Sequence, residues 1–93
     1  MNCISKSDVL KYNNFIILDV RTNEEREIKY IPNSIHIPIN ELENRIKELS
    51  NKNFYITACG KGGGRSILGA EILRKSNFEA SWLCNGTIGW LEK

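Results

Sequence analysis

The sequence predicts an α/β fold in which a parallel sheet is covered by helices on both faces. Two stretches, 15–20 and 54–58, are almost continuously apolar, which is typical of strands that are buried on both sides of such a sheet. Helical patterns of about ten residues separate the expected strands. The chain has 93 residues with 41% hydrophobic and 26% charged side chains, so we expect a single domain, 1–93.

The first half of the chain supplies a short helix and two strands. Ser5 can cap the helix, because Asp8 follows three residues later as in a capping box. The apolar strand 15–20 comes next along the chain. A second strand, 35–39, contains Pro38, which restricts its pairing to a sheet edge or to a strand end.

The second half of the chain continues the alternation of helix and strand. Apolar residues recur at helical spacing in 41–49 and again in 66–75, so both segments are expected to form amphipathic helices. The strand 54–58 lies between them, and a last strand is expected at 81–84. A short helix around 88–91 should then cover the core.

The charge of the chain is nearly balanced, with 13 lysines and arginines against 11 aspartates and glutamates. Its basic residues are scattered, which argues against the basic surface of a protein that binds nucleic acid or membranes. The longest aliphatic run, 15–18, is far shorter than the ~18 residues that cross a bilayer, and no signal pattern is present. We therefore expect a cytoplasmic protein without a nucleic-acid or membrane partner.

The three cysteines, Cys3, Cys59 and Cys84, form an odd set without Cys-x2-Cys spacing or a nearby histidine. Reduced thiols are therefore expected, with no disulfide framework, no metal and no cofactor. Cys84 is interpreted as a buried small hydrophobe, with a resolving thiol as the alternative. Cys3 has no evident role.

The chemistry is expected in the loop between the strand 54–58 and the helix 66–75. In a parallel α/β sheet ligands bind at the carboxyl ends of the strands, so Cys59 should project into the substrate crevice. Glycines in this loop lack the Cβ atoms that would keep successive backbone amides from converging on one anion. The candidate anion-binding residues are Gly60, Lys61, Gly62, Gly63, Gly64, Arg65 and Ser66.

The surroundings of Cys59 favour a thiolate nucleophile. The positive end of the following helix dipole, Lys61 and the guanidinium of Arg65 all attract negative charge. Ser66 can donate its hydroxyl to the thiolate or cap the helix. The alternative is a phosphate-binding loop without covalent chemistry, or a tight turn, but a cysteine and an arginine that bracket glycines are a more restrictive pattern than glycines alone.

Three segments of the chain resemble the rhodanese-like family. The segment Leu18-Asp19-Val20-Arg21-Thr22-Asn23-Glu24-Glu25 resembles its Asp-Val-Arg signature. The segment Ile31-Pro32-Asn33-Ser34-Ile35-His36-Ile37-Pro38 resembles its His-Ile-Pro stretch. Gly86-Thr87-Ile88-Gly89-Trp90 resembles its Gly-Gly-x-x-x-Trp close, with Thr87 in place of the second glycine.

The resemblance implies a five-stranded parallel sheet of order 1-5-4-2-3 and a single-domain sulfurtransferase of the thiosulfate sulfurtransferase type. Cys59 would be the catalytic residue, carrying sulfane sulfur as a persulfide, and Asp19 and Arg21 would have supporting roles. The implied partners are a small-molecule sulfur donor such as thiosulfate and a thiol acceptor. Cyanide, glutathione, a thioredoxin-like protein or a sulfur-carrier protein are the candidate acceptors.

Two features differ from the family pattern. Lys29-Tyr30 replaces a usual Gly-His pair and should alter the rim of the site. Five residues instead of the usual four separate Cys59 from Arg65, which is the spacing of the cell-cycle dual-specificity phosphatases and arsenate reductases of this fold. The loop, however, has no carboxyl group to protonate a leaving alkoxide. Sulfur transfer is therefore favoured over phosphatase or arsenate-reductase-like oxyanion chemistry, and over a non-catalytic binding module.

Two further groups are interpreted as structural. Asp19 and Arg21 lie two apart at a strand end and face the same side, where Arg21 could pair with Asp19 or Glu25 and brace the crevice wall. His36 is the only histidine, and its position between two isoleucines favours a packed or surface side chain over a general base.

Overall fold

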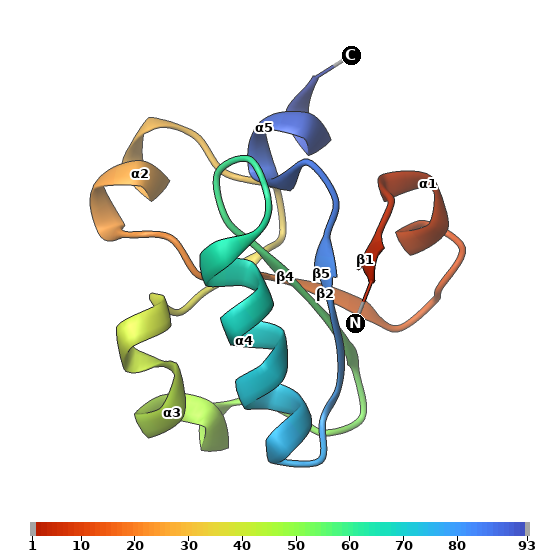
Figure 1. The fold of residues 1–93 in the computed structure, drawn as a ribbon, viewed down its shortest axis with the longest axis vertical. Coiled ribbons are helices and arrows are strands. Elements are labelled where there is room, and N and C mark those ends of the chain that lie inside the picture. Colours follow the sequence, from red (N-terminus) through yellow and green to blue (C-terminus); the bar gives the residue numbers. More distant parts are fainter. Residues whose placement is uncertain (1, 93) are drawn as a thin grey trace.

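The computed structural model describes residues 2–92 and contains a five-stranded parallel sheet of order β1-β5-β4-β2-β3 (Figure 1). The strands are β1 (Cys3–Ile4), β2 (Phe15–Asp19), β3 (Ile35–His36), β4 (Phe54–Ala58) and β5 (Glu79–Leu83). All adjacent strands pair in parallel. The fold class and the strand order that the family resemblance implies are therefore confirmed.

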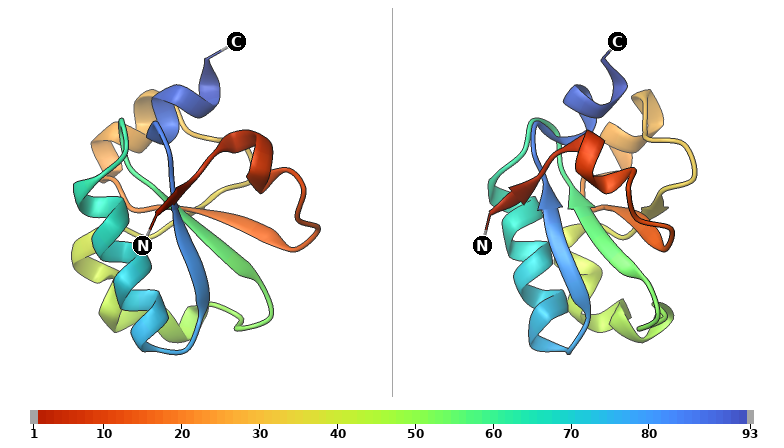
Figure 2. Two further views of the ribbon diagram at one scale, coloured as in Figure 1. Left: turned by 45° about the vertical axis from the view of Figure 1, so that its right-hand side comes forward. Right: turned by 90° about the vertical axis from the view of Figure 1, so that its right-hand side faces the viewer.

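Helices cover both faces of this sheet (Figure 2). They are α1 (Lys6–Val9), α2 (Asn23–Ile28), α3 (Leu42–Arg45), α4 (Gly64–Lys75) and α5 (Gly86–Leu91), with 3-10 turns η1 (Ile39–Glu41) and η2 (Ile46–Glu48) beside α3. Ser5 caps α1 as expected, because its Oγ accepts the Asp8 backbone N–H at 3.2 Å.

Side chains alternate across the central strands and make two apolar clusters. On the α3 and α4 face, Leu18 and Tyr55 pack with Leu42 and Leu73. The opposite face holds a second cluster, made of Val9, Ile17, Ile31, Phe54, Ile56, Ala58 and Leu83, against which Trp90 and Leu91 of α5 pack. The central strands are thus buried on both faces, as their continuous apolar sequence predicts.

The register of the sheet brings the functional segments to one edge. Asp19 at the end of β2 is paired with Ala58 at the end of β4, so the residues after both strands leave the sheet side by side. The loop that follows β4 then lies between α2 and α5 (Figure 1).

Some elements differ from the sequence predictions. The expected helix 41–49 is interrupted, because only Leu42–Arg45 is α-helical and 3-10 turns flank it. The short strand β1 and the helix α2 were not expected from residue patterns. Two residues are too few for a periodic signal, and β1 forms because it pairs with β5.

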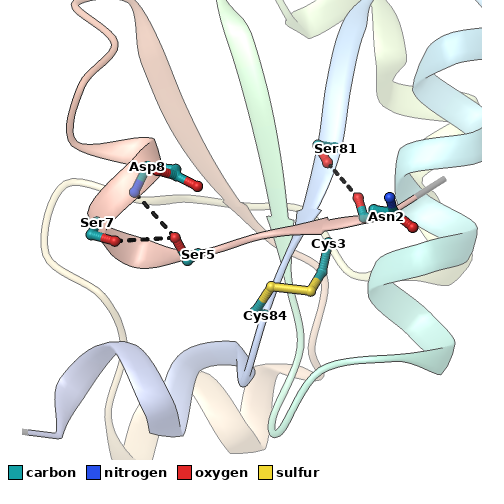
Figure 3. The surroundings of a disulfide bond; sticks show 7 residues. All are labelled: Asn2, Cys3, Ser5, Ser7, Asp8, Ser81 and Cys84. Atoms are coloured by element: carbon teal, nitrogen blue, oxygen red, sulfur yellow. Dashed lines mark hydrogen bonds between the residues drawn. A yellow bond between two sulfur atoms is a disulfide. The ribbon is translucent and has the colours of Figure 1, made fainter.

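The expectation of reduced thiols outside the site is wrong, because Cys3 and Cys84 form a disulfide (Figure 3). Spacing along the sequence did not predict this disulfide, since the two cysteines lie 81 positions apart. The pairing of β1 with β5 sets Ile4 opposite Leu83 and thereby brings the cysteines together. Cys84 is therefore neither a lone buried hydrophobe nor a free resolving thiol. Disulfides that close long loops typically stabilise a fold by about 2–4 kcal/mol.

Within residues 2–92, none of the helices has the length and the apolar character needed to span a membrane.

Candidate active site

Cys59 is a free, buried cysteine directly after β4, and the residue is only 4% exposed. Its Sγ donates toward Ser66 Oγ at 3.4 Å and toward the carbonyl oxygen of Gly63 at 3.6 Å. Ser66 in turn donates its hydroxyl to the same Gly63 carbonyl at 2.7 Å. The thiol therefore lies at the first turn of α4, a helix of 12 residues whose dipole favours a negative sulfur.

The loop turns back on itself through glycine conformations. Gly62 has a φ of +100°, and a Cβ placed there would lie 3.2 Å from the backbone nitrogen of Asn85. A larger residue would thus be strained and would also press on the start of α5. Lys61 is exposed at the outside of this turn, and Gly64 begins α4.

The N-terminus of α5 holds the loop from the other side. The backbone N–H of Thr87 donates to the carbonyl of Cys59 at 2.8 Å, and that of Ile88 donates to the carbonyl of Gly60 at 3.0 Å. Gly86 has a φ of +60° and allows the backbone of α5 to lie this close to the loop. A Cβ at this position would lie 2.5 Å from the carbonyl oxygen of Gly60. Thr87 Oγ1 is buried and has no hydrogen-bond partner among the described residues.

Arg65, expected as an anion ligand, is engaged by a carboxylate. Its Nη1 and Nη2 donate to the two oxygens of Glu25 at 2.6 and 3.1 Å. The hydrogen bonds from Arg65 are the main reason why the pKa of Glu25 is lowered to about 2, and the hydrogen bonds from Thr22 add a smaller effect. Partial burial of the carboxylate opposes this shift. The bonds to Glu25 also raise the pKa of Arg65, and the nearby Cys59 and Asp19 act in the same direction.

Asp19 ends β2 beside Ala58, the residue before Cys59, and forms a buried ion pair with Arg21. Of the two partners expected for Arg21, the structure shows Asp19: Nε and Nη2 donate to its carboxylate, both at 2.9 Å. Arg26 donates to the same carboxylate at 3.3 Å. Burial opposes ionisation of Asp19, but the arginine hydrogen bonds and charge prevail and lower its pKa. His36 contacts the carbonyl oxygen of Arg21 through Nε2 at 2.8 Å.

The sequence named Glu25 only as a possible partner of Arg21, and it predicted neither the contact of Glu25 with Arg65 nor that of Arg26 with Asp19. Thr22 and Glu25 form a capping box, in which Thr22 Oγ1 accepts the N–H of Glu25 while Glu25 accepts the N–H of Thr22. The pattern Thr-x-x-Glu just after β2 is the signal that could have predicted α2.

Most of the site residues predicted from the sequence lie close together in the structure, and Lys61 does not join them. The structure brings Cys59 and Ser66 together within the glycine loop that also carries Arg65, and it places Asp19, the partner of Arg21, beside Ala58 at the same sheet edge. Lys61 points its charge to solvent. Among the described residues, no cluster of three or more His, Cys, Asp or Glu side chains could hold a metal ion.

Two sequence relatives extend well beyond the matched region. The Bacillus subtilis protein named "Putative sulfur carrier protein YrkF" is 43% identical over 63 residues, which cover 68% of this chain and 34% of that protein. The HTH-type transcriptional regulator Rv0324 of Mycobacterium tuberculosis is 31% identical over 77 residues, covering 80% of this chain and 33% of the regulator. The chain therefore spans about a third of the length of these relatives.

Solved structures match almost the entire fold. A rhodanese-related protein from Thermoplasma volcanium has a TM-score of 0.87 at 29% identity, covering 98% of this chain and 91% of its own. A rhodanese-like domain protein from Staphylococcus aureus has a TM-score of 0.85 at 28% identity, covering 100% of this chain and 94% of its own. The family model of the rhodanese-like domain matches residues 5–93. With this match and the order of its five strands, the chain belongs to the rhodanese-like domain family.

Proposed function

We propose that this chain is a sulfurtransferase that moves sulfane sulfur from thiosulfate or a related donor to a thiol or cyanide acceptor through a persulfide of Cys59. The observation that carries the proposal is a free cysteine, buried at the N-terminus of α4 within a glycine-rich loop, in a chain whose other two cysteines are joined. Membership in the rhodanese-like family supports a function of the sulfur-transfer type in general.

The proposed reaction has two nucleophilic displacements at sulfur. The Cys59 thiolate attacks the sulfane sulfur of thiosulfate, the S–S bond of the donor breaks, and sulfite leaves with its electron pair. Cyanide or a thiolate then attacks the outer sulfur of the persulfide and returns Cys59 to the thiolate. Neither leaving group needs a proton from the enzyme, which agrees with a loop that has no acid.

The proposed roles of the other residues follow from their positions. The loop from Gly60 to Ser66 would bind the donor anion with its backbone amides and the helix N-terminus. Ser66 Oγ, 3.4 Å from the sulfur, would turn its hydroxyl toward the thiolate once the thiol proton is gone. Asp19 and Arg21 would hold the wall of the site in place.

Oxyanion chemistry is the second candidate, because five residues separate Cys59 from Arg65 and a longer loop can surround a tetrahedral anion. A phosphatase would need a proton donor for its leaving group. The carboxyl groups near the loop, Glu25 and Asp19, both have lowered pKa values and accept hydrogen bonds from arginines. Both carboxylates would therefore be ionised at neutral pH, which favours sulfur transfer.

Enzyme assays separate these functions. With thiosulfate and cyanide the protein should form thiocyanate, and Cys59→Ser should lose this activity entirely. The double variant Cys3→Ser/Cys84→Ser is the control, because it changes two cysteines that take no part in the proposed steps. Hydrolysis of an aryl phosphate that depends on Cys59, without thiocyanate formation, would instead assign oxyanion chemistry. If neither reaction occurs, and no related sulfur donor loads Cys59 either, a binding module becomes the better proposal.

The proposed partners are a small sulfur donor and a thiol acceptor, which includes thioredoxin-like and sulfur-carrier proteins. The proposed location is the cytoplasm. Disulfides are rare in that compartment, so Cys3 and Cys84 would there be exposed to reduction by cellular thiols. The proposed chemistry uses only Cys59 and is compatible with either state of that pair.

A further inference from the structure

Glu25 is held rigidly beside the loop by donors on two sides. Its Oε1 accepts the backbone N–H and the hydroxyl of Thr22, both at 3.1 Å, within the cap of α2. From the opposite side it receives the bidentate contact from Arg65 at 2.6 and 3.1 Å. Such fork-shaped contacts are geometrically specific and strong. The carboxylate is thus a fixed part of the rim, although its side chain is 35% exposed.

The ion pair lies next to the reacting cysteine. A Cβ placed on Gly60, the residue after Cys59, would be 4.0 Å from Glu25 Oε2. The charge of a Cys59 thiolate is close enough to stabilise the protonated guanidinium of Arg65. The other basic side chain of the loop, Lys61, is exposed and makes no ion pair with any residue the structure describes. The carboxylate of Glu25 therefore already neutralises part of the positive charge that Arg65 could offer to a donor anion.

The consequence for a donor depends on the donor's charge. Thiosulfate is a dianion, so it must share Arg65 with a carboxylate and must approach that carboxylate's negative charge. Glu25 stays ionised at neutral pH and cannot relieve the repulsion by taking a proton. A persulfide, R–S–SH, brings at most one negative charge on the sulfur to be transferred.

We propose that Glu25 is a specificity-determining residue that makes the site favour persulfide donors over dianionic donors such as thiosulfate. The inference rests on the proposed function and narrows its substrate class. In the step that it favours, the Cys59 thiolate attacks the outer sulfur of R–S–SH and forms the new S–S bond. The S–S bond of the donor breaks, and R–S⁻ leaves with the electron pair while the proton stays on the transferred sulfur.

A purely structural role for Glu25 makes a different prediction. If the carboxylate only orients Arg65 or caps α2, its replacement should slow sulfur transfer from every donor to a similar extent. If Glu25 selects donors by charge, its replacement should change the ratio of the kcat/KM values of the two donors. The repulsion between the Glu25 carboxylate and a donor is largest for the dianion, so its loss affects the dianion most. The ratio of kcat/KM values is therefore the informative quantity.

The test is Glu25→Gln, which keeps the shape and an oxygen acceptor for Thr22 and Arg65 while it removes the charge. Transfer of sulfur onto Cys59 is followed by mass with thiosulfate and with 2-hydroxyethyl persulfide, a donor that has no charged group besides the persulfide itself. We expect the thiosulfate-to-persulfide ratio of kcat/KM to rise about tenfold or more. Glu24→Gln is the matched control, because it removes a neighbouring exposed charge of α2 that does not pair with Arg65, and it should leave the ratio unchanged.

Binding of sulfate separates this inference from the proposed function, since sulfate is a dianion that undergoes no transfer. Sulfate should bind Glu25→Gln about tenfold more tightly than the parent protein, even if no donor loads Cys59. Failure of both donors to load the parent protein would overturn the proposed function. An unchanged donor ratio together with unchanged sulfate affinity, or an equal loss with both donors, would overturn the role of Glu25.

Discussion

Replacing Asp19 by Asn should lower the free energy of unfolding by about 3–5 kcal/mol, because the change leaves a buried guanidinium without its counter-charge. The Arg21 side chain is 5% exposed and that of Asp19 is 2% exposed, so water cannot take over the lost interaction. Asparagine keeps the shape of the side chain, and it offers one oxygen where Arg21 now meets two. Arg26 loses its carboxylate contact in the same step and keeps its hydrogen bonds to Ser34.

Chemical denaturation of parent and variant measures this effect. The matched control is Asp8→Asn, which breaks an ion pair with Lys11 whose side chains are 57% and 75% exposed. That substitution should change the unfolding midpoint far less, because water replaces an exposed contact at little cost. Equal effects of the two substitutions would contradict the structural role given to Asp19.

The ion pair between Asp19 and Arg21 should also make the free energy of unfolding depend on pH. Asp19 has a pKa in the folded protein below its ordinary value of 3.8, so the folded state binds this proton more weakly than the unfolded state does. Its stabilisation is present above pH 3.8 and is lost as the pH falls through the folded pKa. The stability difference between the parent and Asp19→Asn should therefore shrink on acidification.

Gly86→Ala should damage both the fold and the proposed active loop. A Cβ at this position would lie 2.5 Å from the carbonyl oxygen of Gly60 and 2.7 Å from that of Cys59, and the φ of +60° disfavours alanine in any case. Backbone strain and two weakened hydrogen bonds together should cost about 2–5 kcal/mol. Because the displaced segment carries Cys59, sulfur transfer should fall by a factor of about 100.

Denaturant unfolding and the thiocyanate assay measure the two effects of Gly86→Ala. Gly64→Ala serves as the control for stability, because its Cβ would meet no atom within 4 Å. Gly64 lies at the start of α4, where alanine should leave stability unchanged or raise it by up to ~1 kcal/mol. A Gly86→Ala protein as stable and active as the parent would show that α5 does not hold the loop.

The sheet was the most predictable part of the fold. The strand Phe54–Ala58 has the predicted bounds, and Phe15–Asp19 differs from its prediction by one residue. Strands buried on both faces produce continuous apolar runs that are visible in the sequence. The order of the strands came instead from the resemblance to the rhodanese-like family, since residue patterns do not state which strands are neighbours.

The contacts that were missed join segments far apart in the sequence. Cys3 and Cys84 meet only because β1 pairs with β5. Glu25 and Arg65 lie 40 positions apart and meet only because the ends of β2 and β4 adjoin. The loop itself was predictable, because its cysteine, glycines and arginine are consecutive and lie between a clear strand and a clear helix.

The most direct test of the proposed function is the intact mass of the protein after incubation with a sulfur donor, thiosulfate or glutathione persulfide. The proposal predicts an added mass of about 32 Da, one sulfur, located on the peptide that contains Cys59 and removed by cyanide or a thiol. Cys59→Ser should show no such addition. An unchanged mass with both donors, or an added sulfur that persists in Cys59→Ser, would contradict the assignment of Cys59 as the sulfur-carrying nucleophile.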